Sequence, residues 1–299
     1  MDTYVIGHKN PDTDSVTSAI ATAELIGYKP AVSGNINKET TFVLSKLNVP
    51  TPEIITDISG KEVFLVDHNE NNQMAAGWEK AKIIGVLDHH KINFSSSEPV
   101  FFHVETLGST CSIIAKTYMG EIKKNPRLAE LLLAGILADT IIFKSPTTTD
   151  EDKAIAADLA LIAGVKDVNE FGMEIKRAGT DISGTSAEAI ISADFKDFDM
   201  NGYKIGIGNV EVIDLSDIEN MKDEIIARLN EIKRDGREAA LFMAIDIIGE
   251  KSLLYFAGDR EKIQLAFGMQ AEKGDTFHFD KIISRKKTVV PSLEGVFKE

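Results

Sequence analysis

Hydrophobic residues in the first half of the chain fall into short runs that alternate with longer segments of helical periodicity. The runs at 4–6, 63–66 and 83–87 have the length and apolar character of buried β-strands. Helical spacing of apolar residues predicts helices from Asp14 or Ser15 to residue 23 and over 39–47, 109–118, 126–143 and 149–163. Because strands and helices alternate, we predict an α/β fold with a largely parallel sheet.

The second half of the chain has a different pattern. A glycine-containing stretch at 178–186 interrupts the helical periodicity, and strand-like runs follow at 204–212, 239–247 and 253–257, with a charged helix at 216–234. A chain of 299 residues also exceeds the usual size of one domain. We therefore predict an N-terminal domain over 1–182, a linker over 183–191 and a smaller α/β domain over 192–299.

Histidine and aspartate gather where the predicted strands end. The residues that follow the three runs are His8, Asp12 and Asp14; Asp67 and His68; and Asp88, His89 and His90. A lone aspartate at such a place is usually a turn or cap residue. The carboxyl ends of parallel strands line one crevice, however, so side chains from three strand ends can converge there. We interpret the pattern as a metal site, in which Asp12 and Asp14, two residues apart, can serve different ions.

Asp139 gives an independent indication. It is the only charged residue in the segment 131–143, which is apolar on all faces and therefore predicts a buried helix. A buried carboxylate must be paired, hydrogen-bonded or bound to metal, and of these we favour metal ligation. We assign His103 and His278 to structural roles, and His68 to orienting the loop beside Asp67.

Composition narrows the function classes. Lys and Arg number 33 against 47 Asp and Glu, a formal net charge of −14, which disfavours broad nucleic-acid binding but leaves a small polyanion open. The single cysteine, Cys111, excludes an internal disulfide and fits a packing role in a reducing compartment. The first strand pattern begins without a basic or long apolar leader, so we expect a cytoplasmic protein without a membrane segment.

Taken together, the motifs resemble the DHH phosphoesterase superfamily and, within it, family II inorganic pyrophosphatases, with the greatest likeness to archaeal members. The Asp-His-His motif alone identifies only the superfamily, whereas its combination with Lys-Ser-Pro-Thr and Ser-Arg-Lys-Lys is specific. The chain has no room for the regulatory nucleotide-binding insertion of some relatives. The motifs are Gly7-His8-Lys9-Asn10-Pro11-Asp12-Thr13-Asp14-Ser15, Val66-Asp67-His68-Asn69, Asp88-His89-His90, Ala138-Asp139-Thr140, Lys144-Ser145-Pro146-Thr147-Thr148-Thr149-Asp150 and Ser284-Arg285-Lys286-Lys287.

The resemblance implies a metal-binding DHH domain, a smaller substrate-binding domain and an active site in the cleft between them. It implies two Mn²⁺ or Co²⁺ ions per subunit, although the ligand types alone would also admit zinc or iron. By resemblance, one ion binds His8, Asp12 and Asp67, and the other binds Asp14, Asp67, His89 and Asp139, so that Asp67 bridges the two.

The resemblance also implies hydrolysis of pyrophosphate to two phosphates by a hydroxide that bridges the metal pair. His90 would contact the substrate and stabilise the leaving group, and Lys196, Arg285 and Lys286 would hold the terminal phosphates. An ordinary solvated surface position remains an alternative for Lys196. Mg²⁺ would arrive with the substrate, and the expected assembly is a homodimer.

Two other functions stay open at this point. A DHH-type oligonucleotide phosphodiesterase or exopolyphosphatase would share the metal centre, but the chain lacks the Gly-Gly-rich, histidine-containing motif typical of the nuclease branch. A noncatalytic metal-dependent binding module is the second alternative. The presence of every expected ligand and of the basic motif at 284–287 disfavours it.

Overall fold

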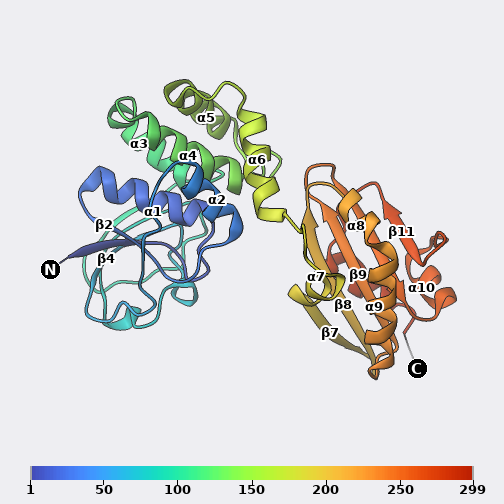
Figure 1. Ribbon diagram of the computed structural model, residues 1–299. Coiled ribbons are helices and arrows are strands. Elements are labelled where there is room, and N and C mark those ends of the chain that lie inside the picture. The colour runs from blue at the N-terminus through green and yellow to red at the C-terminus, as the bar shows by residue number, and fades with distance from the viewer. Residues whose placement is uncertain (1, 298–299) are drawn as a thin grey trace. The chain divides into compact units, whose positions relative to one another are not determined.

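The computed structural model describes residues 2–297, which form two compact units (Figure 1). The first unit extends to Gly179 and the second begins at Thr180. Helix α7 (Ala187–Ala193) therefore belongs to the second unit and overlaps the residues predicted as a linker, 183–191. Its Ile190 and Ile191 are buried in the core of that unit, so this segment is packed structure.

A six-stranded parallel sheet forms the centre of the first unit. Its strand order is β3-β2-β1-β4-β5-β6, and every neighbouring pair is parallel. The chain thus builds the sheet outward from β1 in one direction and then returns to β4 on the other side of β1. The strands are β1 (Thr3–Ile6), β2 (Lys29–Val32), β3 (Glu53–Ile54), β4 (Glu62–Val66), β5 (Lys82–Asp88) and β6 (Phe101–Val104). The reversal between β1 and β4 is where ligands bind in open α/β sheets, at the carboxyl ends of the strands.

Six α-helices accompany this sheet within the described residues. They are α1 (Thr13–Ile26), α2 (Lys38–Lys46), α3 (Thr110–Ile122), α4 (Pro126–Asp139), α5 (Asp150–Ala163) and α6 (Val168–Thr180), with short 3-10 helices η1 (Asn71–Gln73) and η2 (Trp78–Lys80). Helix α4 packs against α1, α3 and α5, as Figure 1 shows, which accounts for its apolar residues on all faces. The N-cap of α1 is Asp12, not the expected Asp14 or Ser15.

The expected helix over 126–143 is too long by four residues. Helix α4 ends at Asp139, and Ile141, Ile142 and Phe143 have positive φ angles of 50°, 53° and 65°. An apolar sequence carries no stop signal here, and tertiary packing decides the end, since Ile142 is buried beside Gly172 of α6. Asp139 is consequently the last helical residue, with 31% of its side chain exposed.

A mixed five-stranded sheet of order β11-β10-β9-β8-β7 forms the second unit. Only β8 and β9 are parallel, and the other pairs are antiparallel. The strands are β7 (Phe195–Met200), β8 (Tyr203–Val212), β9 (Ala239–Asp246), β10 (Lys251–Ala257) and β11 (Thr276–Phe279). Besides α7, the helices are α8 (Ser216–Asn220), α9 (Lys222–Arg234), α10 (Arg260–Phe267), the π-helical turn η3 (Arg285–Val289) and α11 (Val290–Glu294), so the single helix expected at 216–234 is divided in two.

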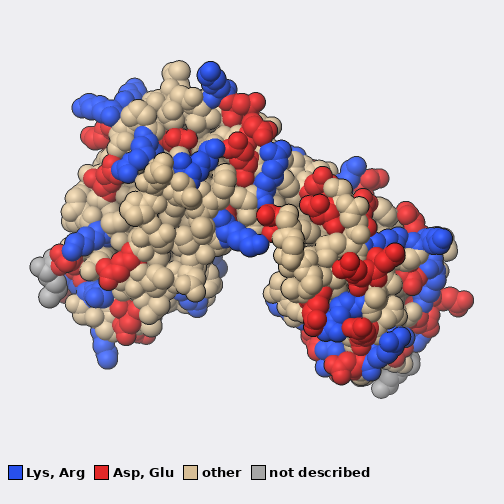
Figure 2. Space-filling model, viewed as in Figure 1, with Lys and Arg blue, Asp and Glu red and all other residues tan. Residues whose placement is uncertain are grey.

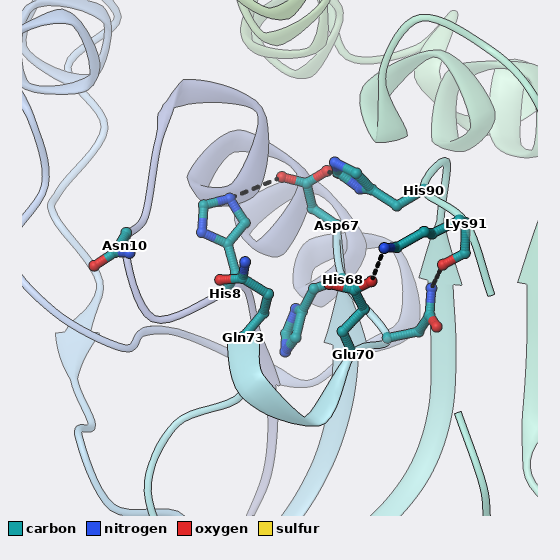
Figure 3. A pocket seen from close by; sticks show the side chains of 9 residues that line it. His8, Asn10, Asp67, His68, Glu70, Gln73, His90 and Lys91 are labelled. Carbon is teal, nitrogen blue, oxygen red and sulfur yellow. Dashed lines mark hydrogen bonds and ion pairs between the residues drawn. The ribbon is translucent and has the colours of Figure 1, made fainter. Parts of the chain in front are cut away.

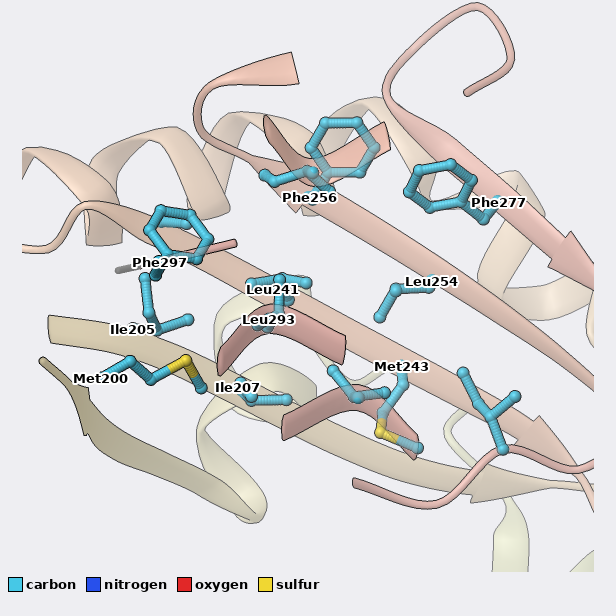
Figure 4. Packing of buried hydrophobic residues seen from close by; sticks show 14 of the residues in the cluster. Met200, Ile205, Ile207, Leu241, Met243, Leu254, Phe256, Phe277, Leu293 and Phe297 are labelled. Carbon is cyan, nitrogen blue, oxygen red and sulfur yellow. The ribbon is translucent and has the colours of Figure 1, made fainter. Parts of the chain in front are cut away.

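Both faces of this second sheet are covered. Along β9, Leu241 and Met243 face a cluster that includes Phe277 and Leu293 of α11 (Figure 4). Phe242, between them in sequence, packs in a separate cluster with residues of α9. Alternate residues of one strand thus supply two cores, which makes the strand apolar throughout.

Within 2–297, no helix has the length and hydrophobicity needed to cross a membrane. On the face of the second unit shown in Figure 2, acidic and basic side chains lie close together, and neither sign dominates. Ion pairs in this unit include the contacts of Asp197 with Arg237 at 2.7 Å and with Lys204 at 3.0 Å.

Candidate metal centre

The loop after β1 supplies the first two candidate ligands. Asp12 caps helix α1, because its Oδ1 accepts a hydrogen bond from the backbone N–H of Ser15 at 3.0 Å. Its other oxygen, Oδ2, lies 3.4 Å from Nε2 of His8. A β-carbon at Gly7 would collide with Ser15 Oγ, so glycine permits the close approach of strand end and helix start. One carboxylate therefore serves both as a helix cap and as a possible metal ligand.

Asp67 occupies the centre of the cluster. It follows β4 directly, its φ angle is 62°, and its side chain is only 2% exposed. Oδ2 lies 3.4 Å from Nε2 of His8, while Oδ1 lies 3.4 Å from Nε2 of His89 and accepts a hydrogen bond from Thr110 Oγ1 at 3.0 Å. Figure 3 shows the Asp67 carboxylate between His8 and His90. The two oxygens of one carboxylate thus face two different histidines.

The remaining candidate ligands are Asp14 in α1, His89 directly after β5 and Asp139 at the end of α4. The buried Asp14 carboxylate accepts backbone N–H bonds from Thr110 at 2.7 Å and Cys111 at 3.0 Å, at the start of α3. His89 Nδ1 lies 3.0 Å from the carbonyl oxygen of Leu107. Because a carbonyl oxygen can only accept a hydrogen bond, the proton is on Nδ1, and Nε2 is left as the atom that can bind a metal. That Nε2 lies 3.4 Å from Oδ2 of Asp139.

Three sets of side chains bring their ligand atoms within 4.8 Å of one another: His8, Asp12 and Asp67; Asp14, His89 and Asp139; and Asp67, His89 and His90. Donor atoms bound about 2.0–2.2 Å from a divalent ion lie about 3.0–3.5 Å apart, and the observed nitrogen–oxygen distances of 3.4 Å match this. The imidazole and carboxylate donors suit a transition metal. The structure thus brings together all six residues predicted as ligands, at one edge of the parallel sheet.

Three groups of the cluster, His8, His89 and Asp139, have raised pKa values when no cation is present. Burial alone would lower the pKa of His8, but hydrogen bonds to Asp12 and Asp67 raise it to about 10. For His89, burial is likewise outweighed, by the Asp67 hydrogen bond and the charge of Asp14, and its pKa also rises to about 10. Burial and the charge of Asp67 raise the pKa of Asp139 to about 7. A cation that binds here therefore takes the place of protons.

His90 stands beside this cluster and is held by Asp88. Asp88 is completely buried, and its Oδ1 lies 2.9 Å from His90 Nδ1, while its Oδ2 accepts a hydrogen bond from Asn69 at 2.6 Å. The hydrogen bond to Asp88 raises the pKa of His90 above its ordinary value. A cavity of about 560 Å³, lined by His8, Asp67 and His90 among others, opens next to it (Figure 3). An oriented histidine thus borders a space large enough for a small polyanion.

The sequence did not predict three contacts that hold the candidate site residues. They are the hydrogen bonds of Thr110 with Asp67, of Asn69 with Asp88 and of the Leu107 carbonyl with His89. No local signal could have found the hydrogen bond from Thr110 to Asp67, since the residues lie 43 positions apart. His68 is buried, and burial lowers its pKa to about 4; its Nδ1 lies 2.9 Å from the carbonyl of Val66.

The two other histidines assigned to structural roles lie outside the ligand sets found among the described residues. His103 pairs with Glu105 at 2.8 Å, and His278 with Glu272 at 3.4 Å.

The basic residues predicted to hold phosphate lie in the second unit. Arg285, at the start of η3, donates from Nη2 to both carboxylate oxygens of Asp194 at 2.8 and 2.9 Å and from Nη1 to carbonyl oxygens of Asp194 and Ile207 at 2.7 and 3.2 Å. Lys196 Nζ lies 3.5 Å from the same carboxylate. Arg285 and Lys196 therefore meet around one anion, while Lys286 is exposed. This arrangement around Asp194 was not predicted.

Comparison with known families agrees with the division into two parts. The family model described as the DHH family, N-terminal domain, matches residues 2–136, and the DHHA2 domain model matches residues 173–296. An exopolyphosphatase-related protein from Bacteroides fragilis, 14% identical and with a TM-score of 0.53 over 98% of this chain and 92% of its own, shares the fold. The fold and its strand-end histidines and aspartates thus define a two-domain DHH protein.

Closer relatives identify the family. The chain is 45% identical to the manganese-dependent inorganic pyrophosphatase of Methanocaldococcus jannaschii, over 98% of this chain and 99% of that one. It is 42% identical to the protein of the same name from Methanothrix thermoacetophila, over 99% and 98% of the two chains. The crystal structure of a candidate family II inorganic pyrophosphatase from Methanococcus jannaschii matches with a TM-score of 0.67 and 43% identity over 99% of both chains. The chain belongs to the family of manganese-dependent, family II inorganic pyrophosphatases.

Proposed function

We propose that this protein hydrolyses inorganic pyrophosphate to two phosphates with the help of two manganese ions. The observation that carries the proposal is the carboxylate of Asp67, whose two oxygens each lie 3.4 Å from a different histidine. One side chain placed in this way suits a ligand shared by two ions. Membership of the family indicates manganese as the metal and pyrophosphate as the substrate, because the names of the relatives contain both.

The family resemblance implies the proposed ligand sets, and the contacts within the first unit support them. His8, Asp12 and Asp67 would hold one ion; Asp14, Asp67, His89 and Asp139 would hold the other. Co²⁺ is an alternative to Mn²⁺ in both places, and Mg²⁺ would accompany the substrate. Two divalent cations held by these residues would lower the pKa of a bound water towards neutral and would neutralise charge on the phosphate under attack.

The protein's own groups would supply orientation and proton transfer. Asp88 Oδ1 accepts a hydrogen bond from His90 Nδ1–H, which would leave the Nε2–H of the charged ring to contact the substrate. The hydrogen bond to Asp88 raises the pKa of His90, which favours the charged ring that would donate a proton to the departing phosphate. Lys196, Arg285 and Lys286 would bind the terminal phosphates, and for a bidentate phosphate contact the Arg285 guanidinium would have to release the Asp194 carboxylate. One water is consumed for each pyrophosphate split.

Two further expectations belong to this proposal. We expect a homodimer, in line with the family resemblance. The edge strand β6 offers a surface for it, because Phe101 is half-exposed there at the edge of the parallel sheet. We also expect the protein to work in the cytoplasm. Sedimentation of the purified protein, with Phe101→Lys as a variant, tests the first expectation.

One assay tests the proposed reaction. Phosphate release is measured from pyrophosphate, from longer polyphosphate and from short oligonucleotides, each with Mn²⁺, Co²⁺, Zn²⁺ or Mg²⁺ added to metal-free protein. We expect pyrophosphate with Mn²⁺ or Co²⁺ to give the highest kcat/KM. Faster cleavage of oligonucleotides or polyphosphate would favour the other DHH activities, and full activity without added metal would exclude the two-metal mechanism.

A further inference from the structure

Asp152, in the first turn of α5, has a contact that helix capping does not require. It is completely buried, and it forms a capping box with Thr149, whose backbone N–H and Oγ1 donate to Asp152 Oδ2 at 2.8 and 2.7 Å. Both carboxylate oxygens also accept the backbone N–H of Gly108, at 3.0 and 2.9 Å. Gly108 is 44 residues away, in the segment between β6 and α3. Asp152 therefore joins its helix to that segment.

The segment 107–111 holds three of the candidate metal ligands. The carbonyl of Leu107 accepts from His89 Nδ1 at 3.0 Å. The backbone N–H groups at 110 and 111 donate to the carboxylate of Asp14, at 2.7 and 3.0 Å. The hydroxyl of residue 110 donates to Oδ1 of Asp67, the oxygen that faces His89. All three ligands belong to the set of Asp14, Asp67, His89 and Asp139, and of these only Asp67 is shared with the other set.

The other ligand set is held differently. Asp12 is fixed by its hydrogen bond to the Ser15 N–H, and His8 contacts Asp12 and Oδ2 of Asp67. None of the hydrogen bonds given for these two side chains within 2–297 comes from 107–111. A displacement of that segment would therefore act first on His89 and Asp14.

Close packing limits where the segment can lie. A β-carbon at Gly108 would stand 2.8 Å from Thr140 Cγ2 and 2.9 Å from Asp152 Oδ2, both too close for ordinary contact. Thr140 directly follows Asp139, the remaining candidate ligand of the same set. Gly108 is thus enclosed between Asp152 and the end of α4, and only glycine fits.

We propose that Asp152 is a positioning residue for the metal ion bound by Asp14, His89 and Asp139, acting through Gly108 and the segment 107–111. It does not touch the ion, and its carboxylate fixes the backbone that orients the ligands. Outer partners of this kind usually change metal affinity about 10- to 100-fold when they are lost. The inference rests on the two-ion site of the proposed function.

The experiment titrates metal-free protein with Mn²⁺ and follows binding by calorimetry and by electron paramagnetic resonance. In Asp152→Asn, an amide nitrogen replaces one of the two oxygens that accept the N–H of Gly108. Two N–H groups then face each other, and that hydrogen bond is weakened. We expect one of two Mn²⁺ affinities to fall about 10- to 100-fold, while the other changes less than about 3-fold. Asp150→Asn is the matched control: the same substitution in the same helical turn, at an exposed side chain, should leave both affinities unchanged.

Two further variants separate positioning from stability. Thr149→Ala weakens the helix cap and leaves the Gly108 contact in place, so it should lower the melting temperature without selective metal loss. Gly108→Ala keeps the Asp152 carboxylate but forces the segment 107–111 away from it. We expect this variant to lose affinity at the same single Mn²⁺ site. It replaces Asp152→Asn in the test if that variant does not fold. Unchanged affinities, or an equal loss at both sites, in the folded Asp152 and Gly108 variants would overturn the proposal.

Mn²⁺ binding and pyrophosphate hydrolysis by the wild-type protein test the proposed function separately from the role of Asp152. If it binds fewer than two Mn²⁺ ions or does not hydrolyse pyrophosphate, the proposed function fails. If it does both and Asp152→Asn binds manganese as the wild type does, only the role of Asp152 is refuted.

Discussion

Replacing Arg285 with alanine tests whether the second unit binds the substrate. In the structure, this side chain is 11% exposed and makes a bidentate pair with Asp194 and a bond to the carbonyl of Ile207. Its loss removes hydrogen bonds from a charged donor, so we expect the free energy of unfolding to fall by about 1–3 kcal/mol. If Arg285 also contacts pyrophosphate, the variant should lose about 2–4 kcal/mol of transition-state stabilisation. This loss corresponds to a fall in kcat/KM of roughly 30- to 900-fold.

Arg237 offers a matched control for this experiment. It is 14% exposed, forms a bidentate pair with Asp197 at 2.7 and 3.0 Å, and donates to the carbonyl of Ile232. Arg237→Ala should therefore cost about the same stability without a comparable loss of kcat/KM.

The assay combines steady-state kinetics, chemical denaturation and measurement of bound manganese for both variants. We expect Arg285→Ala to retain wild-type metal content, because the six candidate ligands all lie in the first unit. Kinetics indistinguishable from those of Arg237→Ala would refute the role in substrate binding and assign Arg285 to structure alone. Loss of manganese would show that the residue acts on the metal centre instead.

Asp67→Asn should weaken both manganese sites and nearly abolish hydrolysis, because an amide offers one ligand oxygen instead of two; retention of two tightly bound ions would contradict the shared-ligand assignment. Chelation of the wild-type protein should likewise remove activity, with recovery on addition of Mn²⁺ or Co²⁺. Asp139→Asn should weaken one site and change the free energy of unfolding by less than about 1 kcal/mol, since the side chain is at a helix end and partly exposed; a large stability loss with normal binding would indicate a core role. Because the pKa values of His8 and His89 are about 10 in the metal-free protein, ion binding at pH 8 must displace their protons, so affinity should rise with pH by about tenfold per unit for each proton displaced. Calorimetry in buffers of different ionisation enthalpy measures that release, and its absence would disprove the protonated state.

Sequence patterns were sufficient to predict the class of fold, and they also singled out the side chains that the structure brings together at the strand ends. Short apolar runs followed by histidine and aspartate predict parallel strands whose ends converge, and the α/β fold with two sheets is confirmed. The ligand assignments stay a prediction, although the structure brings the six residues together. Local motifs work here because each strand end contributes a contiguous group of polar residues.

Other features depend on contacts that no local pattern contains. The apolar segment around Asp139 gives no sign that its helix ends there, because the end is decided by packing of Ile142 against another helix. The pair formed by Arg285 and Asp194 spans 91 positions of sequence. The sequence therefore indicates which side chains are chemically notable, but not which neighbours hold them.

The left-handed backbone at Asp67, with a φ angle of 62°, narrows which amino acids position 67 can accept. Glycine, asparagine and aspartate tolerate such a conformation best among the twenty. A ligand shared by two ions needs two equivalent oxygens on a short side chain, which only aspartate among those three provides. Glutamate keeps the carboxylate but extends it by one carbon from a backbone it does not favour. Substitution at this position is thus disfavoured both by the backbone conformation and by the proposed role as a shared ligand.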